Sequence, residues 1–328
     1  MVKKNLVFLS YGRESEYLRA IFCIYSFLAW SGAEERNSRL VIYTDQPEFF
    51  KPFLEKLEVS YVLLTPELME EMLDNTGCIH RRKIAVIDLT FKAYPGEDLL
   101  FLDSDTFFIN SSTDLFNGFA EGKSFMHKYE YTFIEALALF KSFNQGEYPA
   151  AFINYISGRS FRIGDREERF SENDFGWNSG VLGLSSGFAS YMPDVFKLND
   201  EFFANSRWFI SEQLAFGLIL QRRTVLKGSD QYVYHYWGKR QKVLIDQMII
   251  DLFDEKSVSD LRVNSSLIKS LTKKWARAVE VDLIAEQAVI ALSHKQWKYG
   301  TKKAVQVILK SPFDVNIYKE LLNAVKST

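Results

Sequence analysis

The chain has 328 residues, of which 47% are hydrophobic and 25% are charged. This length and composition are typical of one large α/β domain with an appendage, or of two domains, and exclude disordered, collagen-like and coiled-coil chains. The formal net charge is −2, which gives no global reason to expect a nucleic-acid partner.

Cysteine content and apolar runs indicate the compartment. Cys23 and Cys78 are too few for a disulfide framework and too far apart for a zinc or redox motif. The apolar run Leu6–Leu9 is too short for a secretory signal, and no window reaches the roughly 18 apolar residues of a membrane-spanning helix. We therefore expect a cytoplasmic protein with reduced, buried cysteines.

Short apolar runs alternate with stretches of helical spacing from Asn5 onwards, which is the rhythm of βαβ units. The first part of the chain is predicted to form a strand at 6–9, a helix at 17–31, two strands at 40–43 and 61–64, and a helix at 83–94. The next run, Leu99–Leu102, is almost wholly apolar, as expected of a central parallel strand covered on both faces. It delivers Asp103-Ser-Asp105 to its carboxyl end, where open α/β sheets bind ligands.

The second half of the chain changes character twice. Residues from Ser124 to about Phe175 mix helical and irregular signals and indicate an insertion over the sheet. The predicted elements beyond it are a strand at 181–184, a helix around 212–220 and a strand near 232–234. After about Asp246 only helical spacing is found. We therefore predict an α/β domain over 1–245, with an insertion at about 124–175, and a helical C-terminal extension over 246–328.

The strongest single feature is the pair Asp103 and Asp105 at the exit of a buried strand. Two carboxylates so close crowd negative charge where neutral residues would cost less free energy. A hard divalent cation removes that cost, since magnesium and manganese bind through one or two carboxylates together with substrate phosphates. The alternative is an acidic turn facing solvent, because Asp and Ser both favour turns. Apolar strands on both sides of the pair favour the metal site.

Four short motifs succeed one another along the chain: Asp103-Ser-Asp105, Asn178-Ser-Gly180, Glu212-Gln213 and His235-Tyr-Trp-Gly238. Their order resembles the GT-A fold glycosyltransferases, in particular glycosyltransferase family 8, the retaining group that includes glycogenin. That resemblance covers about residues 5 to 245. It implies a mixed, mostly parallel sheet flanked by helices, and a metal ion that holds the diphosphate of a nucleotide sugar.

The same resemblance assigns roles to individual residues. It implies a Mn²⁺ or Mg²⁺ site at Asp103, Asp105 and His235, with Asp103 also near the donor ribose. Donor binding would further involve Lys83, Asn178 and Gly180, and the catalytic pair beside the anomeric carbon would be Glu212 and Gln213. Two of these have a simpler interpretation: Asn178-Ser-Gly180 is also a common turn, and Lys83 with Arg81 and Arg82 also fits a solvated basic face.

The chain departs from the family pattern at two places. Glu212 stands where the family usually has Asp, so its carboxylate lies one methylene further out. Gln241 stands where the family has a lysine, six residues after His235, and Lys239, Arg240 or Lys242 could supply the missing charge, because a phosphate needs only a cation within reach.

The sequence thus predicts metal-dependent transfer of a sugar from a nucleotide-diphosphate sugar, with a uridine diphosphate sugar as the commonest donor type in the resembling family. The acceptor, whether a glycan, a lipid-linked molecule or a protein, is not specified. One alternative is a haloacid-dehalogenase-like phosphatase, since Asp103-Ser-Asp105-Thr106 fits its D-x-D-x-T loop, in which the first Asp is a nucleophile. That class expects the loop on the first strand and a late acidic pair, which Gly164-Asp165 does not provide. Another is an inactive transferase fold that only binds.

The C-terminal segment carries a charge of its own. Residues 265–328 contain 11 Lys and Arg against 5 Asp and Glu, a net of +6 that leaves −8 for residues 1–264. Trp275, Trp297 and Tyr299 lie among the basic residues, and this mixture suits peripheral binding to an anionic membrane surface. The alternative is a helical subdomain that packs its apolar stripe on the core and leaves its lysines solvated.

Overall fold

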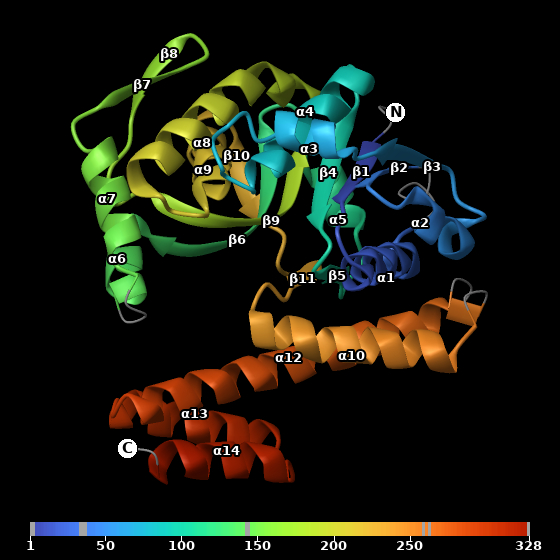
Figure 1. Ribbon diagram of the computed structural model, residues 1–328, viewed down its shortest axis with the longest axis vertical. Coiled ribbons are helices and arrows are strands. Elements are labelled where there is room, and N and C mark those ends of the chain that lie inside the picture. The colour runs from blue at the N-terminus through green and yellow to red at the C-terminus, as the bar shows by residue number, and fades with distance from the viewer. Residues whose placement is uncertain (1–3, 33–37, 142–144, 258–259, 262–263, 327–328) are drawn as a thin grey trace. The chain divides into compact units, whose positions relative to one another are not determined.

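The computed structural model describes residues 4–32, 38–141, 145–257, 260–261 and 264–326 (Figure 1). The chain divides into two compact units, Met1–His235 and Tyr236–Thr328. The last strand, β11 (Val233–His235), ends shortly before helix α10 (Lys239–Glu255) begins. The boundary that we expected between residues 245 and 246 therefore lies inside a helix.

The described strands of the first unit form a seven-stranded central sheet with the order β10-β6-β9-β4-β1-β2-β3. In that order the strands are Val225–Gly228, Lys123–Thr132, Phe175–Leu184, Asp98–Asp103, Lys4–Leu9, Arg39–Thr44 and Val59–Leu63. Neighbouring strands are parallel except at β9, which runs antiparallel to both β4 and β6. The predicted α/β class and mostly parallel sheet are confirmed.

The helices of this unit pack on both faces of the sheet. In Figure 1, α4, α8 and α9 lie on one face, and α1 and α2 lie on the other. The helix bounds are α1 Glu14–Trp30, α2 Pro47–Leu54, α3 Pro66–Glu71, α4 Arg81–Ala93, α5 Thr113–Gly118, α6 Phe133–Lys141, α7 Glu147–Ile156, α8 Met192–Ser206 and α9 Ser211–Arg223, with a 3₁₀ helix η2 at Ser186–Tyr191. Leu99–Leu102 of β4 is fully buried because this strand lies in the middle of the covered sheet.

One segment differs from the expected insertion. Residues 124–132 belong to β6, a strand of the sheet itself, and only the elements after it, namely α6, α7 and the hairpin of β7 (Ser160–Ile163) and β8 (Arg166–Arg169), lie outside the sheet. The pairing of β6 with β9 shifts register between Met126 and Lys128 and again between Tyr129 and Tyr131. Such bulges break the alternation of buried and exposed side chains that identifies a strand in a sequence.

The second unit is helical, as predicted. After α10 come α12 (Ser265–Ser293), α13 (Trp297–Lys310) and α14 (Val315–Lys326). These last three share an apolar core whose buried members are Ile284, Ala285, Ala288, Leu292, Val307, Ile317, Leu321 and Ala324. Of the helices that the structure describes, none combines the length and the apolar character that crossing a membrane requires.

Candidate functional site

Strand pairing brings three sequence motifs to one edge of the sheet. Leu102 of β4 pairs with Val181 of the reversed strand β9, so Asp103 and Gly180 are the next residues at the same end. A small second sheet adds His235, because β11 pairs with β5 (Thr106–Phe108) and sets His235 opposite Thr106. Residues from three distant parts of the sequence therefore meet at the carboxyl end of β4.

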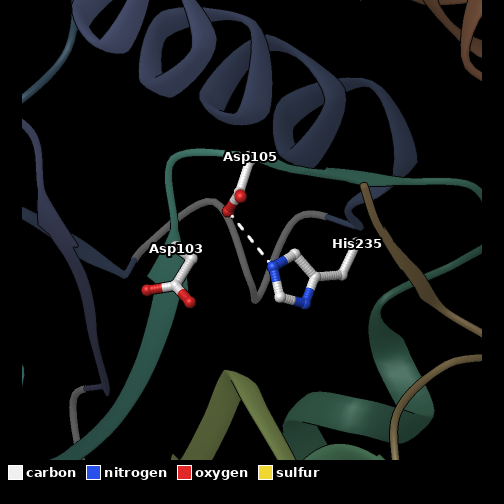
Figure 2. A group of neighbouring side chains, drawn as sticks. All are labelled: Asp103, Asp105 and His235. Carbon is white, nitrogen blue, oxygen red and sulfur yellow. Dashed lines mark ion pairs between the residues drawn. The ribbon is translucent and has the colours of Figure 1, made fainter. Parts of the chain in front are cut away.

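Asp103, Asp105 and His235 form a cluster that could hold a metal ion. One ligand atom from each lies within 4.8 Å of the others, and Figure 2 shows Asp105 and His235 joined by an ion pair with Asp103 beside them. The Nε2 atom of His235 lies 3.2 Å from Oδ1 of Asp105, and these two side chains are 5% and 7% exposed. Two carboxylates and one imidazole make a donor set that suits a divalent ion such as Mn²⁺.

The orientation of the His235 ring is fixed by a hydrogen bond at Nδ1, the nitrogen that faces away from Asp105. The amide oxygen of Asn178 accepts a hydrogen bond from the Gly180 backbone N–H at 3.0 Å, and the same oxygen lies 2.8 Å from Nδ1 of His235. Because an oxygen can only accept, Nδ1 carries a proton directed toward Asn178, and Nε2 faces Asp105 in the cluster. Metal-binding histidines are commonly held this way by a hydrogen bond to the other nitrogen.

Gly180 leaves the space that this histidine occupies. A Cβ added at Gly180 would overlap the imidazole of His235, with its Cε1 only 2.5 Å away. The space at Gly180, a residue we expected to take part in donor binding, is therefore filled in this structure by the side chain of His235.

Lys83 joins the metal cluster to the predicted catalytic pair. Its ammonium lies 2.9 Å from Asp103 Oδ2 and 3.0 Å from Glu212 Oε1. Burial alone would lower the pKa of Lys83, but the two carboxylates outweigh that effect and raise the pKa above its ordinary value. The alternative of a solvated basic face is wrong, since Lys83 is buried and its neighbour Arg81 is paired with Asp200.

Glu212 and Gln213 begin helix α9 and are both buried. Ser179 Oγ donates a hydrogen bond of 2.6 Å to Glu212, and the Ser179 backbone N–H donates one of 3.1 Å to the amide oxygen of Gln213. Burial alone would raise the pKa of Glu212, but the charge of Lys83 and the hydrogen bond from Ser179 lower it overall. Glu212 is therefore held as a carboxylate.

Two residues of β6 belong to this site and were not identified from the sequence. Glu130 accepts hydrogen bonds from Asn178 and Gln213, and the ring of His127 lies edge-on to His235 with 5.3 Å between centroids. Burial lowers the pKa of His127 to about 3, so this ring is neutral and donates from Nε2 to the Val233 carbonyl at 3.1 Å. The run His127-Lys-Tyr-Glu130-Tyr is rich in β-forming aromatic residues, which is the signal that could have identified the strand.

The position of the expected family lysine has a structural role in the second unit. Gln241 is buried and donates to Asp282 at 2.8 Å and to Glu286 at 3.1 Å, and it packs so closely on Gly238 that a Cβ there would overlap it. Arg240 is paired with Asp282 within the same unit.

The features that a phosphatase of the haloacid-dehalogenase type would need are not brought together. Asp103 ends β4, which comes after three earlier strands in the chain. The side chain of Asp165 is 87% exposed in the turn between β7 and β8. Asp105 instead contacts His235.

Comparisons with known proteins give similarity at the level of the fold. No protein-family model matches the chain, and no curated protein matches its sequence. The galactosyltransferase LgtC, solved with donor and acceptor sugar analogues, is 14% identical with a TM-score of 0.47, over 77% of this chain and 96% of that one. Mouse xyloside xylosyltransferase 1 is 15% identical with a TM-score of 0.44, over 69% and 85% of the two chains. The glycosyltransferase GlyE of Streptococcus pneumoniae TIGR4 is 11% identical with a TM-score of 0.43, over 78% and 65%. Because each of these TM-scores is below 0.5, we rest the functional assignment on the side chains of the site.

Proposed function

We propose that the protein transfers a sugar from a nucleotide-diphosphate sugar, most simply a uridine diphosphate sugar, to an acceptor, with a divalent metal bound by Asp103, Asp105 and His235. The observation that carries this proposal is the juxtaposition of that cluster with Lys83 and Glu212 at the carboxyl end of β4. Transfer from a nucleotide-diphosphate sugar requires three groups close together: ligands for a metal ion, a cation near the diphosphate and a carboxylate near the sugar.

The leaving group of the reaction is a nucleoside diphosphate, so negative charge grows on the bridging phosphate oxygen as the bond to the sugar breaks. A bound Mn²⁺ would neutralise part of that charge as a Lewis acid. Lys83 would neutralise more, because its buried ammonium is fixed before the donor arrives and needs no reorganisation. Asp103 would hold both cations in place, since it contacts Lys83 and belongs to the metal cluster.

The sugar becomes positively charged as the donor bond breaks. Glu212, held as a carboxylate by Lys83 and Ser179, is the negative group we place beside the anomeric carbon. Gln213 would lie on the same side, with its amide oxygen already engaged by Ser179. Retention of anomeric configuration is part of the proposal through the resemblance to glycosyltransferase family 8.

The donor can be tested by thermal shift on the full chain. Uridine diphosphate sugars should raise the melting temperature when Mn²⁺ is present, and EDTA should remove the effect. A ligand at 100 times its dissociation constant stabilises by about 2.7 kcal/mol, which is enough to move a melting curve. The Asp105→Asn variant keeps the shape but loses a charged oxygen, so it should fold, lose the shift and lose transfer activity by orders of magnitude.

The same assay separates the alternatives. Hydrolysis of simple phosphate esters without any shift by nucleotide sugars would support the phosphatase and reject the transferase. Donor binding without turnover toward any glycan, lipid-linked or protein acceptor would support the inactive binding module. The Cys78→Ser variant is the control, and its donor shift should equal that of the wild type.

We also propose that the second unit binds an anionic membrane surface. Three side chains around the turn between α13 and α14 are strongly exposed, namely Leu309 at 76%, Phe313 at 93% and Val315 at 61%. The basic excess of residues 265–328 accompanies them. Exposed apolar residues among lysines are the pattern of a peripheral membrane contact.

A further inference from the structure

Glu130 on strand β6 lies between the side-chain amides of two residues of the site, Asn178 and Gln213. Its Oε1 accepts a 3.2 Å hydrogen bond from the side-chain amide of Asn178, and its Oε2 accepts a longer one, 3.5 Å, from the side-chain amide of Gln213. Asn178 contacts the metal-cluster residue His235, and Gln213 belongs to the proposed catalytic pair. One carboxylate thus holds one amide on each side.

The hydrogen bonds of Asn178 fit only one orientation of its amide. The oxygen accepts from two N–H groups, those of Gly180 and His235, so the NH₂ group must be directed toward Glu130. A carboxylate accepts at both oxygens and donates from neither, so it can oppose only an NH₂ group. Glu130 and the Gly180 N–H therefore favour the same orientation of Asn178, the one that accepts the proton of His235 Nδ1.

The amide of Gln213 is selected in the same way. Its oxygen accepts from the Ser179 backbone N–H, and its NH₂ group faces the second oxygen of Glu130. If this amide turned over, its NH₂ group would face the Ser179 N–H and its oxygen would face the carboxylate, and both contacts would be repulsive.

Glu130 reaches these partners because β6 lies next to β9 in the sheet. Lys128 pairs with Asn178 and Tyr129 with Trp177, and Glu130 lies in the bulge that follows, between Tyr129 and Tyr131. Bulges redirect side chains near active sites. Burial raises the pKa of Glu130 above its ordinary value, and donation from Asn178 and Gln213 opposes this.

We infer that Glu130 is a positioning residue that sets the tautomer of His235 through Asn178 and the amide orientation of Gln213, and so prepares both the metal ligand and the catalytic pair. This inference rests on the proposed function for its use of a metal, but its geometric part holds in the metal-free protein. No contact of Glu130 with the donor or with the metal is implied.

The substitution Glu130→Gln isolates this role because it preserves shape and replaces one acceptor by a donor. The new amide can satisfy Asn178 or Gln213, but it then opposes its NH₂ group to the NH₂ group of the other. Adding Asn178→Asp should repair the network. The introduced aspartate still accepts from Gly180 and His235, and its second oxygen accepts from the NH₂ group of the introduced glutamine, whose oxygen accepts from Gln213. The double variant also has the same net charge as the wild type.

Two measurements on the full-length protein test the inference. Imidazole ¹⁵N chemical shifts in the metal-free state report which nitrogen of His235 carries the proton, and titration with Mn²⁺ alone gives the metal affinity. We expect Glu130→Gln to mix the tautomers of His235 and to weaken Mn²⁺ binding about 10- to 100-fold, which is the range for partners behind a metal ligand. The double variant should return both readouts toward wild type.

The control is Glu135→Gln, which alters a carboxylate of the neighbouring helix α6 that contacts Tyr129 and Thr132. It should leave both readouts unchanged. Wild-type ¹⁵N shifts and Mn²⁺ affinity in Glu130→Gln, or a double variant no better than Glu130→Gln alone, would overturn the inference. If Glu130→Gln does not fold, Asn178→Asp alone, which sets two carboxylates against each other, should show the same loss and regain it on addition of Glu130→Gln. Should the wild type not bind Mn²⁺, the proposed function fails, while the ¹⁵N shifts still decide the role of Glu130.

Discussion

Lys83 is the residue on which the charge balance of the site depends, because it contacts two carboxylates at once, the buried one of Glu212 and the partly exposed one of Asp103. Replacing it by Met should lower the free energy of unfolding by about 3–5 kcal/mol, since breaking a buried pair leaves uncompensated charge. In a double-mutant cycle with Glu212→Met, the double variant should lose less than the sum of the single variants. Urea denaturation measures all four proteins.

The control for this cycle lies on the same helix. Lys92 pairs with Asp88 one turn away and its side chain is 70% exposed. Lys92→Met should therefore cost less than about 1 kcal/mol. Additive losses for Lys83→Met and Glu212→Met would contradict the coupling that the 3.0 Å contact implies.

Gly180 provides a second prediction at this scale. A methyl group there has no room unless the His235 ring moves, so Gly180→Ala should weaken Mn²⁺ binding by about tenfold or more. Isothermal titration with Mn²⁺ and a melting curve measure the two effects separately. Gly187→Ala is the control, because among the described residues its added Cβ would come within 4 Å of Ser185 Oγ alone, at 3.9 Å. Equal Mn²⁺ affinities in both variants would contradict the prediction, because they would show that the His235 ring can move aside without loss of metal binding.

The first turns of helices α4 and α9 carry opposite charges, Lys83 on α4 and Glu212 on α9, and these two side chains form an ion pair. Because of this pair, the free energy of unfolding depends on pH. Because the folded pKa of Glu212 is lowered from 4.5, the unfolded chain binds its proton more readily. The stabilisation is present above pH 4.5 and is lost as the pH falls through the folded pKa.

Unfolding free energies of the metal-free protein should therefore fall less steeply on acidification in Glu212→Gln than in the wild type. Glu130 has a raised pKa and contributes with the opposite sign, but it is present in both proteins and cancels from the difference. Urea denaturation at several pH values below 5 measures the two slopes. Parallel curves would show that the pairing with Lys83 does not lower the pKa of this carboxyl group.

Secondary structure could be predicted where one simple pattern covers an element. The apolar run Leu99–Leu102 predicted β4, and its carboxyl end predicted the place of Asp103 and Asp105. The bulged strand β6 was not predicted, because two register shifts disturb its alternation. Glu130 and His127 were missed with it.

The side-chain contacts of the site could be predicted less well than the secondary structure. The motif order suggested that Asn178 and Gly180 face a ligand, but only the pairing of β5 with β11 shows that His235 fills the space between them. That pairing joins residues more than a hundred positions apart, which no local pattern records.

At the scale of the whole molecule, the basic excess belongs to a unit with its own apolar core. The three helices α12 to α14 bury Leu292 and Val307 among themselves, while Leu309 and Phe313 remain exposed. This arrangement favours an external partner for the exposed pair, and the proposed partner is an anionic membrane.

Co-sedimentation of the full chain with phosphatidylglycerol and phosphatidylcholine vesicles tests that proposal. We expect pelleting with the anionic vesicles that weakens at high salt, since each Lys or Arg near such a surface contributes about 1 kcal/mol and salt screens it. The Leu309→Ser/Phe313→Ser variant should pellet much less. Val225→Ser, which alters a 59% exposed side chain of the first unit, should pellet like the wild type. Equal pelleting with both lipids, or none with either, would reject the membrane as the partner.

The contact of Lys83 with both Asp103 and Glu212 has a consequence for how the protein matures. A site whose carboxylates already have a cation among them does not wait for a metal in order to fold, in contrast to small domains whose folding free energy is their metal-binding free energy. The newly made chain can therefore reach its native state in a metal-poor environment and acquire the ion afterwards. Under the proposed function, supply of the ion would then set the fraction of active molecules, while the number of folded molecules would not depend on it.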